Sequence, residues 1–311
     1  MLFIETNSQN PYFNLAAEEY LVQNKSEEIF MLWRNSSSVI IGRNQNALSE
    51  IDYDFITKNS IPVVRRMSGG GAVFHDEENL NYTYIINCEK DGDQFGNYEF
   101  FTKLLCDFLK EKGVLAYLSG RNDILVDGRK ISGNAQYKWH GRLMHHGTIL
   151  VGADMARLSG ALTPDERKIK SKGIKSVKSR VANINEFIDI DAKAFFNDFK
   201  KWVISSGMEE YSLTDGEIAE IKALAKEKYE TYEWNFGYSP KYDFRKKEYF
   251  PSGSVEVCLK ISNGIIEDAK IFGDFFSAEG VEGLENALKN KKHEIDTLRE
   301  AVNVVWKENM I

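Results

Sequence analysis

Three consecutive glycines, Gly69–Gly71, stand between two segments that predict β-strands, 62–67 and 80–87. Glycine accepts backbone conformations that other residues avoid, so we expect a loop whose bare N–H groups let a flat or anionic ligand approach the main chain. Arg65 and Arg66 directly precede the loop and add permanent charge that suits phosphate. The spacing matches neither the Walker A nor the GxGxxG motif. A surface turn with solvated arginines is the alternative to a binding loop, and the flanking residues favour the loop.

The composition limits the compartments and partners of the chain. Of its 311 residues, 42% are hydrophobic and 28% are charged, which is typical of a globular protein. The formal net charge of −7 disfavours nucleic acid as a partner, because binding phosphate backbones needs a positive face. No apolar run approaches the roughly 18 residues of a membrane span, and the N-terminus lacks the pattern of a secretory signal. The three cysteines are far apart, without a CxxC motif, and indicate a reducing, cytoplasmic environment.

A second segment of interest covers residues 120–135. It contains Asp127-Gly128 between apolar residues, which predicts a tight β-hairpin. Lys130 follows this turn on a strand, where a lysine is a positioned charge that can stabilise a phosphate or a developing oxyanion. Ser132, Gly133 and Ala135 are small and leave room for a ligand beside it. A solvated lysine at a sheet edge is the alternative interpretation.

The pair His145-His146 lies in a third segment, which predicts a strand at 143–151. Neighbouring side chains on a strand point to opposite faces, so at most one of the two histidines faces a given site. The chain has no HExxH motif, which disfavours zinc, and a buried structural histidine is the alternative to a ligand contact.

A basic segment, Lys168 to Arg180, contains five lysines and one arginine but no acidic residue. A loop that closes on a nucleotide, with a hinge at Gly173, is one interpretation. A solvated basic loop is the other.

The hydrophobic pattern divides the chain into a large and a small part. Helices are predicted at 14–25, 98–112, 191–206 and 214–226, and strands at 29–33, 38–43, 62–67, 80–87, 123–132 and 143–151. A charged stretch at 238–248 predicts a linker, followed by a hairpin around Asn263-Gly264 and helices at 282–288 and 293–306. Because strands and helices do not alternate regularly, we expect an α+β fold with a mixed or antiparallel sheet, and domains at 1–240 and 248–311.

Taken in order, these segments resemble those of the lipoate–protein ligase family. A single motif of this kind is weak, whereas the ordered set is specific and spans nearly the whole chain. The matching motifs are Leu32-Trp33-Arg34-Asn35, residues 39–45, the run 65–76 around the glycines, Gly120-Arg121-Asn122-Asp123, Arg129-Lys130-Ile131-Ser132-Gly133, His145-His146-Gly147-Thr148, residues 172–181 and residues 232–237.

The resemblance implies a biotin-ligase-like catalytic domain with a small α/β accessory domain, and a two-step reaction. Lipoate and ATP form lipoyl-AMP and pyrophosphate. A lysine of an apo lipoyl domain, in an E2 subunit of a 2-oxoacid dehydrogenase or in the glycine cleavage H protein, then accepts the lipoyl group. Mg²⁺ is expected with the ATP, and its ligands are not evident from the sequence.

The resemblance also implies roles for single residues. Lys130 is expected to be the catalytic residue and to touch both the nucleotide and the lipoyl carboxylate. The other nucleotide contacts are expected at Arg66, Gly71, Ala72, Val73 and Phe74. Further substrate contacts are expected at Arg65, Ser68, His75, Asn122, Asp123, Gly133 and His146. Because the first step joins two anions, it needs fixed positive charge more than a protein nucleophile, which agrees with these residue types.

Two rival functions differ in testable ways. An ATP-independent transferase that moves octanoyl or lipoyl groups between carrier proteins would use a cysteine nucleophile, and no cysteine lies between Asp107 and Val257. A non-enzymatic module that only binds lipoate or nucleotide would release no pyrophosphate. The preference between lipoate and octanoate stays open.

Overall fold

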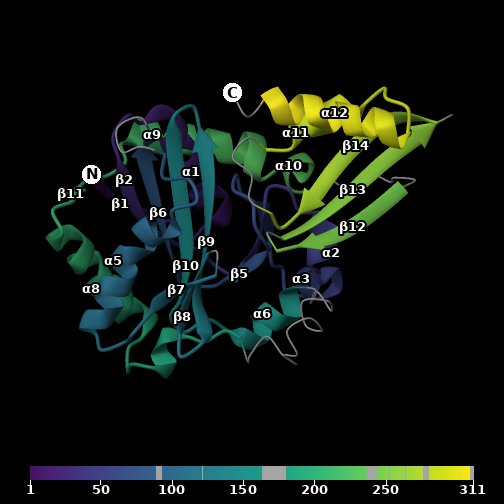
Figure 1. Ribbon diagram of the computed structural model, residues 1–311. Helices are drawn as coiled ribbons and strands as arrows, with labels where there is room; N and C mark the ends of the chain where they lie inside the picture. The colour runs from purple at the N-terminus through teal and green to yellow at the C-terminus, as the bar shows by residue number, and fades with distance from the viewer. Residues whose placement is uncertain are drawn as a thin grey trace.

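The computed structural model describes residues 1–88, 93–120, 122–162, 180–236, 244–251, 253–262, 264–275 and 280–308. Its centre is an eight-stranded sheet (Figure 1). In spatial order the strands are β11 (Glu209–Glu210), β1 (Leu2–Glu5), β2 (Ile29–Arg34), β6 (Asn79–Asn87), β10 (Arg142–Leu150), β9 (Arg129–Trp139), β8 (Asp123–Val126) and β7 (Tyr117–Ser119). Strand β1 runs parallel to β2 and β11, and the other neighbours are antiparallel. The predicted α+β fold with a mixed sheet is confirmed.

One face of this sheet carries the main hydrophobic core. Strand β6 alternates, so that Tyr82 and Tyr84 point into this core while Asn81 and Thr83 point to the other face. Helices α5 (Tyr98–Glu111) and α8 (Ala192–Ser205) cover the core face with aromatic side chains such as Phe108. Both helices were predicted to within a residue or two, because their apolar residues recur at helical spacing.

The opposite face is covered by helices α1 (Pro11–Asn24) and α9 (Asp215–Leu224), which continues into a π-helix, η3 (Ala225–Tyr229). Asn10 caps the start of α1 by accepting backbone N–H bonds, and Thr214 and Glu217 form a capping box at the start of α9. A short 3₁₀ helix, η2 (Ile184–Glu186), lies between β10 and α8 in the chain.

A second, three-stranded sheet packs beside this face and carries the glycine loop. Its order is β4 (Val63–Arg65), β3 (Ser38–Ile41) and β5 (Val73–His75), with β3 parallel to β4 and antiparallel to β5. Helices α2 (Ala47–Glu50), α3 (Tyr53–Lys58), α6 (Met155–Ala161) and α10 (Tyr232–Phe236) surround it. The loop therefore connects two strands of this small sheet. The predicted upstream strand is β4, whereas the predicted downstream strand, 80–87, is β6 of the eight-stranded sheet, and β5 was not predicted.

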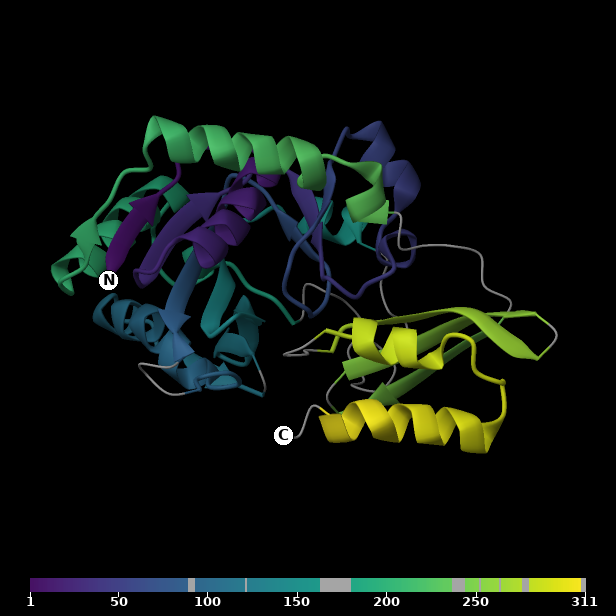
Figure 2. The same ribbon diagram turned by 90° about the horizontal axis from the view of Figure 1, so that it is seen from above.

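The C-terminal part forms a separate small unit with its own core (Figure 2). Strands β12 (Phe244–Phe250), β13 (Gly253–Ser262) and β14 (Ile265–Gly273) form an antiparallel sheet, and helices α11 (Glu282–Leu288) and α12 (Ile295–Glu308) cover it. Strand β12 occupies half of the predicted linker at 238–248. Its charged residues lie on an exposed edge strand, a pattern that resembles a linker in the sequence.

Several contacts join the small unit to the large part. Arg43 and Glu282 form an ion pair at 2.7 Å. The Gly273 N–H donates to the Asn44 carbonyl at 2.8 Å, and the Gly70 N–H donates to the Phe275 carbonyl at 3.3 Å. The small unit thus contacts the glycine loop itself.

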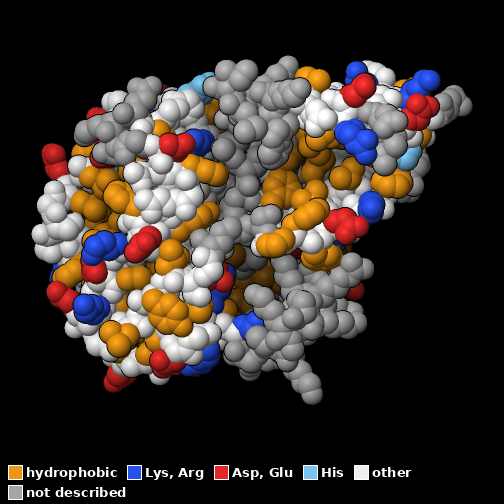
Figure 3. Space-filling view, in the orientation of Figure 1, with side chains coloured by type: hydrophobic (Ala, Val, Ile, Leu, Met, Phe, Trp, Pro, Cys, Tyr) orange, Lys and Arg blue, Asp and Glu red, His pale blue; other side chains and the backbone are white. Residues whose placement is uncertain are grey.

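On the face shown in Figure 3, Lys and Arg side chains are interspersed with Asp and Glu. None of the helices in the described ranges has the length and apolarity needed to cross a bilayer.

Candidate functional site

A pocket of about 120 Å³ lies between the eight-stranded sheet and the three-stranded sheet. Its floor is a row of residues in register across the strands. Trp33 on β2 pairs with Asn81 on β6, which pairs with Thr148 on β10, and the Thr148 hydroxyl accepts the Gly133 N–H of β9. Gly133 in turn pairs with Asp123 on β8. Because neighbouring strands lie roughly 4.8 Å apart, the row from Trp33 to Gly133 spans about 14 Å.

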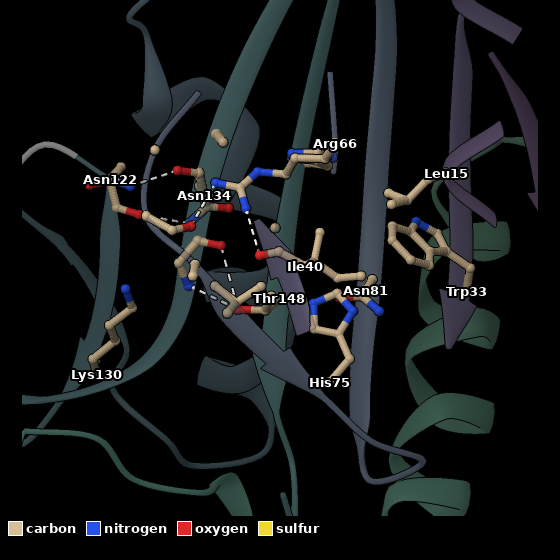
Figure 4. A pocket seen from close by; sticks show the side chains of 18 residues that line it. Leu15, Trp33, Ile40, Arg66, His75, Asn81, Asn122, Lys130, Asn134 and Thr148 are labelled. Carbon is tan, nitrogen blue, oxygen red and sulfur yellow. Dashed lines mark hydrogen bonds between the residues drawn. The ribbon is translucent and has the colours of Figure 1, made fainter. Parts of the chain in front are cut away.

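One end of the pocket is cationic and the other is apolar (Figure 4). Lys130 and Asn122 line the first end, whereas Leu15 and Trp33 line the second. Such a shape suits a molecule with an anionic head and an apolar tail.

The position of Lys130 depends on an irregularity in the hairpin. A register shift between Ile124 and Leu125 inserts one extra residue into β9. Residues three apart on a regular strand face opposite sides of the sheet. Here, however, the Lys130 ammonium lies over Gly133. Its Nζ is 2.7 Å from the position that a Cβ on Gly133 would take. The ammonium also pairs with Asp123 at 2.7 Å and is about one-third exposed. A side chain at position 133 would displace the lysine.

The backbone of Lys130 anchors the chain that follows the basic segment. Its N–H donates to the Arg180 carbonyl, and its carbonyl accepts the Ala182 N–H. The rest of the predicted basic segment, up to residue 179, lies outside the described residues.

Arg66 holds the glycine loop around its own guanidinium. It donates to the carbonyls of Gly69 at 2.6 Å and Gly71 at 2.8 Å, and its Nε donates to the Ser68 hydroxyl at 3.0 Å. Burial lowers the pKa of Arg66 to about 10, which leaves it charged at neutral pH. The loop is therefore shaped by a buried cation that also lines the pocket.

A chain of buried polar groups runs behind the pocket wall. The Ser68 hydroxyl lies 2.6 Å from Nε2 of His146, and Nδ1 of His146 lies 2.8 Å from a carboxylate oxygen of Glu18. That carboxylate oxygen also accepts the Thr83 hydroxyl at 2.6 Å, and Thr83 accepts the Trp33 indole N–H at 2.9 Å. These bonds link the loop residue Ser68 to Trp33 at the opposite end of the pocket.

The two adjacent histidines separate as the strand geometry predicts. His146 faces the pocket, whereas His145 faces the core, where its ring stacks on Phe101 at 4.5 Å. Burial lowers the pKa of His145 well below its usual value, so this ring is neutral.

Arg65 takes a different place from its neighbour Arg66. Its fully buried guanidinium donates to backbone carbonyls of the 42–45 loop and of α10. Trp234 and Asn235 supply the carbonyls of α10. Arg65 is not among the residues that line the pocket. Its guanidinium ties three segments together and is directed away from the substrate site for which the sequence predicts it.

The other predicted residues divide into those that line the pocket and those one contact behind it. The lining residues are Arg66, Gly71, Ala72, Val73, His75, Asn122, Lys130, Gly133 and His146. Ser68 and Asp123 lie behind the pocket wall. Ser68 is hydrogen-bonded to His146, and Asp123 forms an ion pair with Lys130. The Phe74 side chain, predicted as a nucleotide contact, is buried in the core of the three-stranded sheet.

Several pocket residues were not predicted from the sequence as nucleotide or substrate contacts. They are Leu15, Trp33, Ile40, Gly70, Asn81, Asn134, Ala135, Gly147 and Thr148. Trp33, Gly147 and Thr148 lie within the motifs that resemble the ligase family, and this position could have identified them as site residues. The only sequence signal for Asn81 is the alternation along β6, in which polar residues recur between apolar ones.

None of the described residues that line the pocket carries a carboxylate. Among the described residues, no three His, Cys, Asp or Glu side chains cluster in a way that could hold a metal. Asp123 lies at the cationic end beside Lys130. This arrangement fits Mg²⁺, which in nucleotide sites takes one or two carboxylates and otherwise phosphate and water oxygens.

Comparison with protein families places both parts of the chain. Residues 10–205 match the lipoyl protein ligase A/B catalytic domain, and residues 239–310 match the bacterial lipoate protein ligase C-terminus. Lipoate–protein ligase 1 of Staphylococcus aureus is 43% identical over 97% of this chain and 94% of its own length. Lipoate-protein ligase LplJ of Bacillus subtilis is 42% identical over 98% of this chain and 94% of its own length.

Solved structures agree with the sequence relatives. Plasmodium falciparum LipL1 in complex with lipoate superposes with a TM-score of 0.76 at 28% identity, over 99% of this chain and 94% of its own. A lipoate-protein ligase A bound with ATP gives a TM-score of 0.66 at 28% identity, over 76% and 98%. The bipartite ligase of Thermoplasma acidophilum, studied with its E2 lipoyl domain, gives 0.67 at 30%, over 78% and 98%. With a catalytic module and a C-terminal module both matched, this chain belongs to the lipoate–protein ligase family.

Proposed function

We propose that the chain activates lipoate with ATP and attaches it to a lysine of apo lipoyl domains, in E2 subunits and in the glycine cleavage H protein. The observation that carries the proposal is the polarity of the pocket, with Lys130 at one end and Trp33 and Leu15 at the other. A carboxylate at Lys130 leaves the acyl tail along the register row toward Trp33. The lipoate and ATP bound by related ligases, and the E2 lipoyl domain studied with one of them, support this choice of substrates and partner.

In the first step, a carboxylate oxygen of lipoate attacks the α-phosphorus of ATP. The bond from this phosphorus to the bridging oxygen breaks, and pyrophosphate leaves with the electron pair. Both reactants are anions, so the Lys130 ammonium lowers the barrier by holding the carboxylate beside the phosphate and offsetting the charge that builds up there. We assign the nucleotide to Arg66 and the 71–74 segment of the glycine loop.

In the second step, the neutral amine of the target lysine attacks the acyl carbon of lipoyl-AMP. The carbon–oxygen bond to AMP breaks, an amide forms and the amine loses a proton. The mixed anhydride is already activated, so this step uses the same fixed charges and needs no nucleophile from the protein. Mg²⁺ bound with ATP would supply further charge neutralisation at the phosphates, and Asp123 is the residue that would hold it.

The other residues around the pocket have supporting roles. Asn122, Gly133, His75 and His146 contact the substrate from the pocket walls, and Ser68 acts by positioning His146. The protein works in the cytoplasm, with a catalytic domain at 1–240 and an accessory domain that includes β12 from residue 244, four residues before the predicted start.

Intact-mass measurement of an apo lipoyl domain tests the proposal. After incubation with this protein, lipoate and ATP-Mg, the domain is expected to gain the mass of one lipoyl group, and pyrophosphate is expected in the solution. Omitting ATP should abolish both. Modification without ATP from an octanoylated carrier would instead identify a transferase, and binding of lipoate and ATP without either product would identify a binding module.

A further inference from the structure

Two buried polar groups at the apolar end of the pocket have no partner in the protein. They are Nε2 of His75 and Nδ2 of Asn81, and both residues line the pocket. His75 is 3% exposed and Asn81 is 1% exposed. A buried polar group without a hydrogen bond destabilises a protein, so unpartnered groups in a ligand pocket indicate that the ligand supplies the partner.

The hydrogen-bond network makes the His75 nitrogen a donor. The Asn35 side-chain oxygen accepts from Asn14 at 2.9 Å, so the Asn35 amide nitrogen faces Nδ1 of His75, 3.1 Å away. An amide nitrogen can only donate, so Nδ1 accepts and the ring proton resides on Nε2. Burial and the charge of Arg66 lower the pKa of His75 to about 3, and the ring is therefore neutral with this one N–H.

In the structure, the amide nitrogen of Asn81 is the donor that lacks a partner. Its side-chain oxygen accepts a hydrogen bond from the Asn79 amide at 3.0 Å, which leaves the amide nitrogen unpaired. Asn81 is also the cross-strand partner of Trp33, and the His75 ring centroid lies 6.0 Å from that of Trp33. Both donors thus flank the Trp33 indole, which closes the apolar end. Trp33 is on β2, three strands away from β9 and Lys130.

A substrate whose carboxylate lies at Lys130 reaches this end of the pocket only with its tail. The two donors therefore face the tail. A saturated tail has no acceptor and would leave both groups buried without a partner. The ring sulfurs of lipoate are weak acceptors that remain compatible with an apolar wall. We propose that Asn81 and His75 make the pocket selective for the dithiolane ring of lipoate over a saturated acyl tail, by donating N–H bonds to its sulfurs. This inference rests on the proposed function.

The experiment compares three acids in pyrophosphate release: lipoate, octanoate and the cyclopentyl analogue of lipoate, in which methylene groups replace both sulfurs. The analogue keeps the ring and removes the acceptors. The unmodified protein is expected to favour lipoate over the analogue in kcat/KM by about tenfold, mainly through KM, because the analogue leaves buried donors unpaired.

The Asn81→Leu variant has a side chain of similar size without the donor. Its preference for lipoate over the analogue should fall several-fold, because octanoate and the analogue no longer leave an amide unpaired and bind better. Asn24→Leu makes the same change at an exposed position at the end of α1, and its preference should equal that of the unmodified protein. Calorimetric titration of each variant with each acid gives the same ratio without catalysis.

The results separate this inference from the proposed function. Equal kcat/KM for lipoate and the analogue in the unmodified protein would overturn the inference, whatever the folding of Asn81→Leu. An unchanged preference in a folded Asn81→Leu protein would also overturn it. Inactivity of the unmodified protein on all three acids would overturn the proposed function instead.

Discussion

At the scale of single residues, the pocket places the Lys130 ammonium where the two anionic substrates would meet. We expect Lys130→Ala to lower the rate of pyrophosphate release by about 100-fold or more, because losing a preorganised charge at a reacting centre typically costs that much. The fold should be unaffected, since the ammonium is partly exposed and its ion pair with Asp123 is of the surface kind.

The matched control for this prediction is Lys138→Ala, which removes a lysine from the other end of the same strand. Lys138 pairs with Asp93 and does not line the pocket. Its variant should keep the rate of the unmodified protein. A Lys130→Ala protein with near-normal pyrophosphate release would remove this lysine from the mechanism.

Buried neutral histidines make stability depend on pH. The pKa of His145 is well below its usual 6.5 in the folded protein, so below that pH the unfolded chain takes up a proton that the folded chain does not. The free energy of unfolding should therefore fall as the pH drops below about 6.5, by up to about 1.4 kcal/mol per pH unit for each such histidine. The lowered pKa of His75 acts in the same direction.

Urea unfolding at several pH values checks this prediction. His145→Gln removes one of the two histidines whose pKa is lowered by burial and should reduce the slope of stability against pH. His140→Asn changes an exposed histidine at positive φ, where asparagine is tolerated, and should leave the slope unchanged. Equal slopes in all three proteins would show that His145 is protonated as easily in the fold as in the unfolded chain.

At the scale of elements, the glycine loop is held from inside by Arg66 and is open toward the pocket. An alanine Cβ at Gly71 would meet no atom within 4 Å, and the backbone there is outside the region reserved for glycine. Gly71→Ala should therefore fold normally. If the nucleotide lies against the loop, the same methyl group should raise the KM for ATP by about tenfold or more.

Gly216→Ala is the control for the loop variant, since this glycine lies in α9, where alanine favours the helix. It should leave the KM for ATP unchanged. An unchanged KM in Gly71→Ala would mean that the nucleotide does not approach this part of the loop.

Arg65 joins three elements and is expected to act on stability. Lysine has one nitrogen and cannot reach the carbonyls of the 42–45 loop and of α10 together, so Arg65→Lys leaves several buried acceptors unpaired. We expect a loss of about 3 kcal/mol or more in the free energy of unfolding, measured with urea. Arg129→Lys, at a half-exposed ion pair with Glu186, should cost less than about 1 kcal/mol. Normal stability of Arg65→Lys with a raised KM for lipoate would restore the substrate contact predicted for this residue.

At the scale of the whole molecule, none of the three cysteines is placed to act as a nucleophile in the pocket. Burial raises the pKa of Cys106 and of Cys258 to about 11, and burial also raises the pKa of Cys88. None of the three lines the pocket that contains Lys130. A thiol of high pKa away from the site is a poor nucleophile.

A variant with Cys88→Ser, Cys106→Ala and Cys258→Ala should therefore still modify an apo lipoyl domain with lipoate and ATP. Mass spectrometry of the unmodified protein should find no acyl-enzyme. A hydroxylamine-sensitive thioester, together with activity that needs no ATP, would favour the transferase.

The sequence by itself determined what depends on near neighbours. The helices at 98–111 and 192–205, the Asp127-Gly128 hairpin and the α9 capping box follow from local spacing and turn chemistry, which act over a few residues. Strand alternation likewise separated His145 from His146. The ordered motifs also indicated the family, because each is a short run of residues.

Only the tertiary structure decided which of these residues meet. Arg65 and Arg66 are adjacent and chemically identical, yet one ties α10 to a loop and the other shapes the pocket, because they point to opposite sides of the small sheet. The contact of His146 with Glu18 spans 128 residues of chain and depends on the docking of α1 against β10. Asn81 becomes a pocket residue only through its register with Trp33. Sheet order and register set these contacts, and neither is encoded in the spacing of residues along one strand.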